Sequence, residues 1–191
     1  MIETACRSCQ GSNLETVHAF RETPYGDSYL DSKKKALDLE CHRLTLGRCI
    51  NCHLLQILET TNLETQYGDY LYFTRVTYKL RDFYHKVSNN LSSQLNLTKD
   101  DLLLDIGSND GTFLSCFKSK SLRVIGVDPS RPACEMAKEK GIHTINSFFN
   151  SEVAEIIKSQ FGVPRLVTCN YTIANVPSLA DFLKSGLNYE F

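Results

Sequence analysis

The stretch LLLDIGSNDGT, residues 102–112, decides the fold of this 191-residue chain. A short apolar run of buried-strand type ends in a turn that holds Gly107 and Gly111, and apolar residues at helical spacing follow. The two glycines let the chain leave the strand sharply and let a ligand approach the first turn of the helix. Asn109 stands between them, and asparagine tolerates a left-handed backbone. The stretch therefore predicts a strand–turn–helix unit with a ligand site at its turn.

After this unit, short apolar runs alternate with amphipathic segments. Strands are predicted over residues 102–106, 122–127, 142–145 and 166–169, and helices over about 130–141, 151–162 and 179–187. Strands that are separated by single helices predict right-handed crossovers and a parallel sheet. The predicted fold class is therefore α/β, with a Rossmann-like parallel sheet of about four strands.

An acidic residue, Asp128, follows the second predicted strand. At that place a carboxylate can accept hydrogen bonds from two vicinal ribose hydroxyls, so the loop and the acid together predict a nucleoside site. A dinucleotide fingerprint is not met, because Asn109 and Thr112 stand where its later glycines belong. The glycines also have a purely structural interpretation, because any strand–turn–helix unit needs a glycine to turn tightly.

A helix with one apolar face is predicted to begin near Leu80. Its apolar positions are Leu80, Phe83, Tyr84, Val87, Leu91 and Leu95. His85 and His143 fall on elements that we expect to lie in the core. In the tyrosine-rich stretch before the helix, Tyr70 and Tyr72 share one face if the chain is extended.

Two cysteine pairs lie near the N-terminus, Cys6–Cys9 and Cys49–Cys52, each with two residues between its members. Two such pairs complete a tetrahedral thiolate site for zinc, and a site filled by four cysteines has a structural role. The interval between the pairs exceeds the roughly 15–20 residues of a compact zinc ribbon. Four unliganded thiols, or a redox pair, are the alternatives. Cys41 and His42 are spare candidates that we do not expect to be ligands.

Four sequence features together resemble the sugar C-methyltransferase family: IGSNDGT (residues 106–112), VIGVDPS (124–130), Gly141-Ile142 and Phe148-Phe149. The resemblance extends over the cysteine pairs and nearly the whole chain. It implies a class I methyltransferase fold, behind a zinc module, that binds S-adenosylmethionine and acts on nucleotide-linked keto-deoxysugars. The cofactor-binding residues implied by the resemblance are Asp105, Gly107, Ser108, Asn109, Asp110, Gly111, Asp128, Pro129, Phe148 and Asn170.

The resemblance also concerns the catalytic residues. In the family, tyrosines of the segment before the helix contact the sugar nucleotide, which makes Tyr72 a candidate substrate contact. A histidine follows the fourth strand in the family, but here that position holds Asn175, which cannot act as a base at neutral pH. The catalytic base is therefore not assigned by the sequence.

The chain divides into a zinc-binding module over residues 1–60, a tyrosine-rich segment with a linking helix over 61–98, and a cofactor-binding domain over 99–191. Only four strands of the seven in a class I methyltransferase sheet are readable. An artificially shortened chain, a truncated or split gene product, and a partner chain that completes the fold all stay open. Two alternatives for the function also stay open. The chain is an inactive binder of zinc and S-adenosylmethionine, or it transfers the methyl group to a sugar oxygen or nitrogen.

Composition sets the remaining expectations. The formal net charge is −1, which argues against nucleic-acid binding because that needs clustered basic residues. No apolar run reaches the length of a membrane span, and no signal peptide is visible. We therefore expect a cytoplasmic protein with a small-molecule substrate. The oligomeric state, the acceptor and the methylated atom are not encoded in any recognisable pattern.

Overall fold

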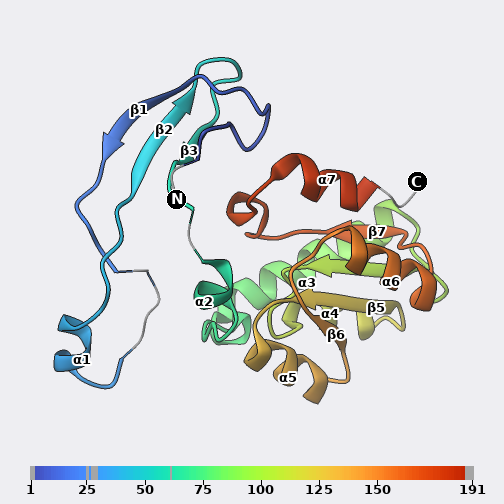
Figure 1. The fold of residues 1–191 in the computed structure, drawn as a ribbon. Coiled ribbons are helices and arrows are strands. Elements are labelled where there is room, and N and C mark those ends of the chain that lie inside the picture. The colour runs from blue at the N-terminus through green and yellow to red at the C-terminus, as the bar shows by residue number, and fades with distance from the viewer. Residues whose placement is uncertain (1–2, 25, 27–29, 61, 188–191) are drawn as a thin grey trace. The chain divides into compact units, whose positions relative to one another are not determined.

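A computed structural model describes residues 3–24, 26, 30–60 and 62–187 of the chain (Figure 1). The chain forms two compact units. The N-terminal unit comprises Met1–Gln66 with Pro177–Ala180, and the C-terminal unit comprises Tyr67–Val176 with Asp181–Phe191. No helix among the described residues is long and apolar enough to cross a membrane.

The N-terminal unit contains a small antiparallel sheet that was not predicted from the sequence. Its strands are paired in the order β1-β2-β3, with bounds Leu14–Ala19, Thr45–Cys49 and Leu55–Ile57. Two short helices, α1 (Lys33–Leu37) and α2 (Leu63–Tyr67), follow β1 and β3. The long interval between the cysteine pairs therefore holds two of the three strands.

The C-terminal unit is built on a parallel four-stranded sheet in the order β6-β5-β4-β7. Its strands are β4 (Leu102–Ile106), β5 (Arg123–Asp128), β6 (His143–Asn146) and β7 (Leu166–Thr168). Its helices are α3 (Tyr78–Gln94), α4 (Thr112–Lys118), α5 (Arg131–Glu139), α6 (Ser151–Phe161) and α7 (Leu179–Leu187), with short 3-10 turns η1 (Thr74–Val76) and η2 (Ile173–Asn175). The predicted α/β fold class and parallel sheet are confirmed.

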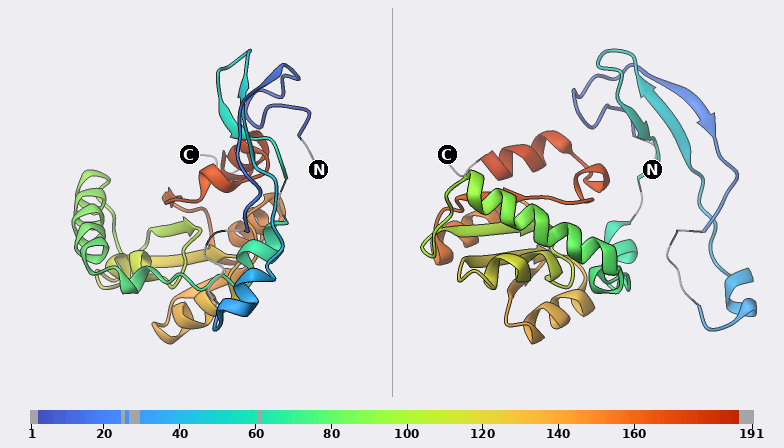
Figure 2. Two further views of the ribbon diagram at one scale, coloured as in Figure 1. Left: turned by 90° about the vertical axis from the view of Figure 1, so that its left-hand side faces the viewer. Right: turned by 180° about the vertical axis from the view of Figure 1, so that it is seen from behind.

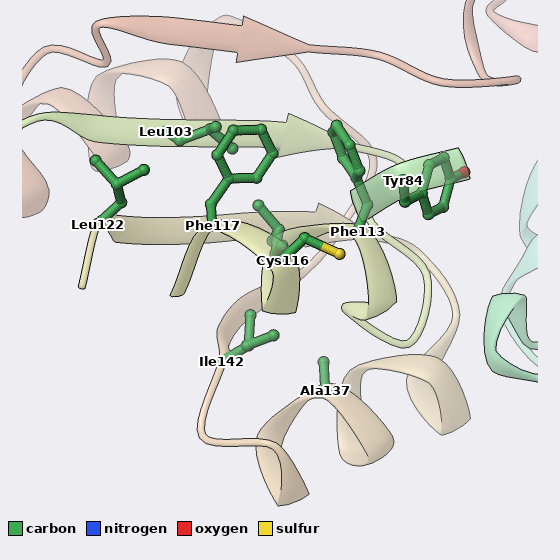
Figure 3. Close-up of a cluster of buried hydrophobic side chains, with 9 residues drawn as sticks. Tyr84, Leu103, Phe113, Cys116, Phe117, Leu122, Ala137 and Ile142 are labelled. Atoms are coloured by element: carbon green, nitrogen blue, oxygen red, sulfur yellow. The ribbon is translucent and has the colours of Figure 1, made fainter. Parts of the chain in front are cut away.

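Helices cover both faces of this sheet, as Figures 1 and 2 show for α3 and α6. On one face, side chains of α3 and α4 pack on Leu103, and the ring of Tyr84 lies 4.7 Å from that of Phe113 (Figure 3). On the other face, Val153 and Ile157 of α6 belong to a cluster with three side chains of β4, Leu102, Leu104 and Ile106. Every residue of β4 is buried, which explains its unbroken apolar run.

Local signals in the sequence set the helix ends. The hydroxyl of Ser130 accepts a hydrogen bond from the N–H of Ala133, which caps α5, and Pro132 lies in the first turn. Asn150 caps α6 in the same way through the N–H of Val153, and Gly162 follows the last helical residue.

Three expectations about α3 and the histidines are wrong. Phe83 is 54% exposed, because the buried face of α3 is centred on Tyr84, which lies about 100° away around a helix. His85 and His143 are both exposed on their elements. The ring of His143 stacks beside Phe161 at the sheet margin, with centroids 5.0 Å apart.

Candidate metal centre and cofactor site

The four paired cysteines of the N-terminal unit converge on one point. Their Sγ atoms all lie within 4.8 Å of one another. The Cys6–Cys52 and Cys9–Cys49 sulfur pairs are both 3.6 Å apart. Four thiolates around zinc, with Zn–S bonds of about 2.3 Å, have sulfur–sulfur separations of about 3.8 Å. The cluster therefore fits a tetrahedral zinc ion.

Two turns of matched geometry hold these sulfurs. In each turn the carbonyl of the first cysteine accepts a hydrogen bond from the residue after the second cysteine, Gln10 in one turn and His53 in the other. These two residues have left-handed backbones, with φ of 60° and 62°. The repetition of one turn in two places shows that each pair is folded as a metal knuckle.

Electrostatics also favour a cation at the cluster. Backbone N–H groups of Cys52 and Asn51 donate toward Cys49 and lower the pKa of its thiol to about 7. The backbone N–H of Leu54 likewise lowers the pKa of the Cys52 thiol. Desolvation and the three other cysteines outweigh it and raise that pKa to about 12. A thiolate at Cys52 is therefore unfavourable until a positive ion balances the charge. Cys41 lies outside the cluster and is exposed.

The glycine loop, residues 107–111, lies between β4 and α4 in the C-terminal unit. Gly107, Asn109 and Gly111 all have left-handed backbones, with φ of 74°, 50° and 70°. The N–H groups of Gly107 and Ser108 donate to the carbonyl of Val127, which fixes the loop against β5. The left-handed conformation expected for Asn109 is confirmed.

Asp128, at the end of β5, faces this loop. Its Oδ2 accepts a 2.7 Å hydrogen bond from the N–H of Asn109, and its Oδ1 accepts one of 2.8 Å from Ser130. Burial raises the pKa of Asp128, and these two N–H groups oppose the rise. A carboxylate has about four lone-pair sites, so the two bonds leave acceptor capacity for two hydroxyls. Next to Asp128, the carbonyl of Pro129 accepts a hydrogen bond from Asn146.

Asp105 lies beneath the loop and is fully buried. Its Oδ1 accepts a 2.6 Å hydrogen bond from Thr168 in the neighbouring strand β7. Burial raises the pKa of Asp105 to about 7; the Thr168 hydrogen bond and the Asn170 side chain oppose this, and the charge of Asp128 adds to it. Asp105 therefore joins β4 to β7 where the strand order reverses, the usual place for a ligand in an open α/β sheet.

The segment after β7 lies against the glycine loop. A side chain at Gly107 would overlap the hydroxyl of Thr172, so the absence of a Cβ is what allows this approach. The hydroxyl of Ser108 is buried and has no hydrogen-bond partner among the described residues. An unpaired buried polar group beside a glycine turn fits a polar ligand better than an apolar packing site.

The tyrosine segment, residues 67–77, lies beside the same loop. The Tyr72 carbonyl accepts a 2.9 Å hydrogen bond from the side chain of Asn109, and its hydroxyl lies 3.0 Å from that of Thr77. Tyr72 is 37% exposed, so part of it can meet a ligand. Phe148, after β6, is half-buried. Asn175, in η2, is exposed and donates to the carbonyl of Tyr171 at 3.3 Å.

Two residues near the loop were not predicted from the sequence. Lys140, after α5, lies 3.3 Å from the carboxylate of the fully buried Asp110 and donates to its carbonyl at 2.7 Å. Thr168 is the partner of Asp105. In the sequence, the contact of Lys140 with Asp110 is indicated by nothing more than the position of Lys140 just before Gly141. A lysine at a helix end is common without any such contact, so this position does not predict it.

Two family models match the chain, one in each of its two parts. Residues 6–67 match a family model described as "Putative zinc binding domain", and residues 72–188 match one described as "Methyltransferase domain". With the cysteine cluster, the first match identifies the N-terminal unit as a zinc-binding module.

Two curated proteins are similar in sequence. The C-methyltransferase NovU of Streptomyces niveus is 28% identical over 178 residues, which are 93% of this chain and 42% of that protein. An uncharacterized methyltransferase of Schizosaccharomyces pombe is 33% identical over 61 residues, 32% of this chain and 24% of that protein. The chain thus spans about two fifths of the length of NovU.

Two solved structures are similar over part of the fold. The plantazolicin methyltransferase BpumL, solved in complex with SAH, is 19% identical with a TM-score of 0.46, covering 58% of this chain and 42% of that one. A SAM dependent methyltransferase from Archaeoglobus fulgidus is 24% identical with a TM-score of 0.30, covering 38% and 33%. Because the methyltransferase-domain model matches more than half of the residues, the chain belongs to the methyltransferase-domain family.

Proposed function

We propose that the C-terminal unit binds S-adenosylmethionine, with the methionine part over the glycine loop and the ribose at Asp128. The observation that carries the proposal is the hydrogen bond from the N–H of Asn109 to Asp128, which brings loop and acid together at the carboxyl edge of the sheet. The buried, unpaired hydroxyl of Ser108 is a further polar group that a cofactor could satisfy.

The remaining cofactor residues have distinct roles in this proposal. Gly107 and Gly111 give the loop its left-handed turns, and the space beside them is occupied by neighbouring side chains of the protein. Pro129 and Phe148 flank the nucleoside. Asp105 supports the glycine loop from beneath and does not contact the ligand directly, because it is fully buried and bonded to Thr168. Bound S-adenosylmethionine would supply an electrophilic methyl group on sulfur, and the protein's task would be to hold that methyl against an acceptor atom.

The proposed acceptor is a small molecule, a nucleotide-linked keto-deoxysugar, methylated on carbon. Methylation on carbon rests on the similarity to the C-methyltransferase NovU over 93% of this chain. The sugar nucleotide rests on the resemblance of the sequence motifs to the sugar C-methyltransferase family. Such a reaction would require a base that removes the proton next to the ketone, and protein groups that hold the resulting enolate carbon against the methyl group that the cofactor would supply. Tyr72 is the proposed acceptor contact.

A second candidate is favoured by Asn175. This side chain cannot accept the proton, and it already donates to the carbonyl of Tyr171. The chain would then bind zinc and S-adenosylmethionine without catalysing transfer, or would need a second chain that supplies the base. Transfer to a sugar oxygen or nitrogen is a variant of the first candidate, because the cofactor site does not determine the acceptor atom.

The proposed role of zinc is structural, because four cysteine ligands leave no open position for a substrate. We also propose a cytoplasmic location, since eight free cysteines suit a reducing compartment. The net charge of −1 favours a small-molecule ligand over nucleic acid.

Two measurements test the proposal in order. Calorimetry with S-adenosylhomocysteine should give saturable binding of one equivalent to the purified chain, and the absence of binding would defeat the cofactor site. Transfer of a labelled methyl group from S-adenosylmethionine to a keto-deoxysugar nucleotide then separates the candidates. Labelled sugar indicates the enzyme, and binding without transfer indicates the second candidate.

A further inference from the structure

The side chain of Asn109 holds the backbone of the tyrosine segment. Its Oδ1 accepts a 2.9 Å hydrogen bond from the N–H of Thr74, and its Nδ2 donates one of 2.9 Å to the carbonyl of Tyr72. These two groups flank Phe73, whose backbone is extended, with φ of −115° and ψ of 127°. The side-chain amide of Asn109 thus makes the two hydrogen bonds, to the residues before and after Phe73, that the backbone of an adjacent parallel strand would make.

Neighbouring residues extend this attachment. The N–H of Arg75 donates a 3.1 Å hydrogen bond to Asp110, whose buried charge is balanced by Lys140. After β5, the hydroxyl of Ser130 donates to the carbonyl of Tyr70 at 2.9 Å, and the N–H of Arg131 donates to that of Gly68 at 3.0 Å. The two loops of the proposed cofactor site therefore both hold the tyrosine segment.

Asn109 connects three parts of the site. Its backbone N–H bonds to Asp128, the proposed ribose acceptor, while its side chain bonds on both sides of Phe73. A ligand that contacts Asp128 and the loop would stabilise their existing arrangement and, through the Asn109 side chain, the tyrosine segment as well. By thermodynamic reciprocity, an ordered segment would strengthen the binding of that ligand.

We propose that Asn109 is a positioning residue that latches the tyrosine segment onto the glycine loop, so that cofactor binding and the order of the acceptor-binding segment are coupled. This inference rests on the proposed function for the identity of the ligand. The latch itself is a property of the chain without ligand, and the two can fail separately.

The matched variants are Asn109→Gly and Asn96→Gly. Both residues have φ of 50°, so glycine removes the side chain in each case and leaves a backbone that it adopts without strain. Asn96 is exposed, just beyond the end of α3, and far in sequence from the loop. The pair separates loss of the latch from the general effect of replacing asparagine by glycine.

Hydrogen exchange of peptides that cover residues 67–77 is the first measurement, made without ligand. We expect exchange in Asn109→Gly to be about tenfold faster than in the wild type, because Thr74 loses its acceptor, and Asn96→Gly to match the wild type. Equal exchange in all three proteins would overturn the latch, whether or not the chain binds the cofactor.

Repeating the exchange with saturating S-adenosylhomocysteine tests the coupling. We expect added protection of residues 67–77 in the wild type and in Asn96→Gly but not in Asn109→Gly, whose dissociation constant should rise about three- to tenfold. The thermal midpoints of both variants, measured alongside, give the general change in stability, and the loss of protection in Asn109→Gly should exceed what that change explains. Equal protection in both variants would overturn the coupling. A wild type that binds no S-adenosylhomocysteine would refute the proposed function and the coupling but leave the ligand-free latch result intact.

Discussion

The carboxylate of Asp128 is joined to the backbone N–H of Asn109 by a 2.7 Å hydrogen bond, although the two residues belong to different strand–turn units. The bond fixes the distance between the proposed ribose acceptor and the loop without any ligand. Such preorganisation lowers the cost of binding, because the protein does not have to order these groups when the ligand arrives.

Replacing Asp128 by asparagine should weaken S-adenosylhomocysteine binding by about 1–3 kcal/mol, since an amide loses one acceptor oxygen and the negative charge. Calorimetry measures the change directly. Glu155→Gln, an exposed change of the same chemical type on α6, should bind like the wild type. Unchanged binding in Asp128→Asn would remove Asp128 from the cofactor site.

Metal content should follow the four clustered cysteines. The purified chain should hold about one zinc, and Cys6→Ser or Cys49→Ser should lose most of it, because a tetrahedral thiolate site does not survive with three ligands at full affinity. Cys41→Ser is the matched control and should keep its metal, since Cys41 lies outside the cluster. Metal-free wild-type protein, with the exposed Cys9 and Cys52 open to alkylation, would contradict the zinc assignment.

The sheet of the C-terminal unit could be predicted because its strands carry clear local signals. Residues 102–106 are all buried, and the predicted strand has the observed bounds. The N-terminal strands carry no such signal. In β1 five of six residues are exposed, and in β2 the buried alternation runs through Thr45, Gly47 and Cys49, which do not form an apolar pattern. Pairing between these strands, rather than local sequence, forms that sheet.

The candidate site was predictable in its backbone and less so in its side chains. The left-handed conformation of Asn109 follows from its place between two glycines. Its side-chain partners, Tyr72 and Thr74, precede it by more than thirty residues, and no periodicity relates them. The side-chain partners of Asp110 could not be predicted from the sequence either. The resemblance assigned Asp110 to the cofactor, whereas the structure bonds its carboxylate to Arg75, Thr112 and Lys140.

Asp105 should make stability depend on pH. Its pKa is raised to about 7 in the folded protein, against about 3.9 in an unfolded chain, so the folded state favours the protonated form. Stability is therefore lost as pH rises from about 4 to about 7. The neutral variant Asp105→Asn avoids this loss. Its free energy of unfolding relative to the wild type should rise by on the order of 2 kcal/mol between pH 5 and pH 8.

Urea titrations followed by circular dichroism at the two pH values measure this difference. The zinc module also responds to pH, but equally in both proteins, so it cancels in the comparison. Asp101→Asn is a suitable control, because hydrogen bonds from Thr98 lower the pKa of that carboxyl instead of raising it. A difference for Asp105→Asn that stays constant with pH would show that Asp105 is ionised throughout the range.

Gly107→Ala should destabilise the C-terminal unit through two separable effects. The first is the left-handed backbone, which costs a residue with a Cβ roughly 1–2 kcal/mol. The second is overlap with the hydroxyl of Thr172, and overpacking of this kind costs about 1–3 kcal/mol. Gly141→Ala isolates the first effect, since Gly141 has φ of 67° and a Cβ there would meet only the end of the flexible Lys118 side chain. Denaturation midpoints should therefore fall further for Gly107→Ala than for Gly141→Ala.

A double-mutant cycle with Thr172→Ala identifies the overlap. Removing the hydroxyl should restore part of the stability that Gly107→Ala loses, and it should restore none of the loss in Gly141→Ala, because additivity holds for distant sites. The same cycle, measured as S-adenosylhomocysteine affinity, asks whether the approach of Thr172 to Gly107 shapes the cofactor site. Rescue of stability without rescue of affinity would mean that the glycine is needed for the ligand itself, and rescue of both would mean that it is needed for the neighbouring loop.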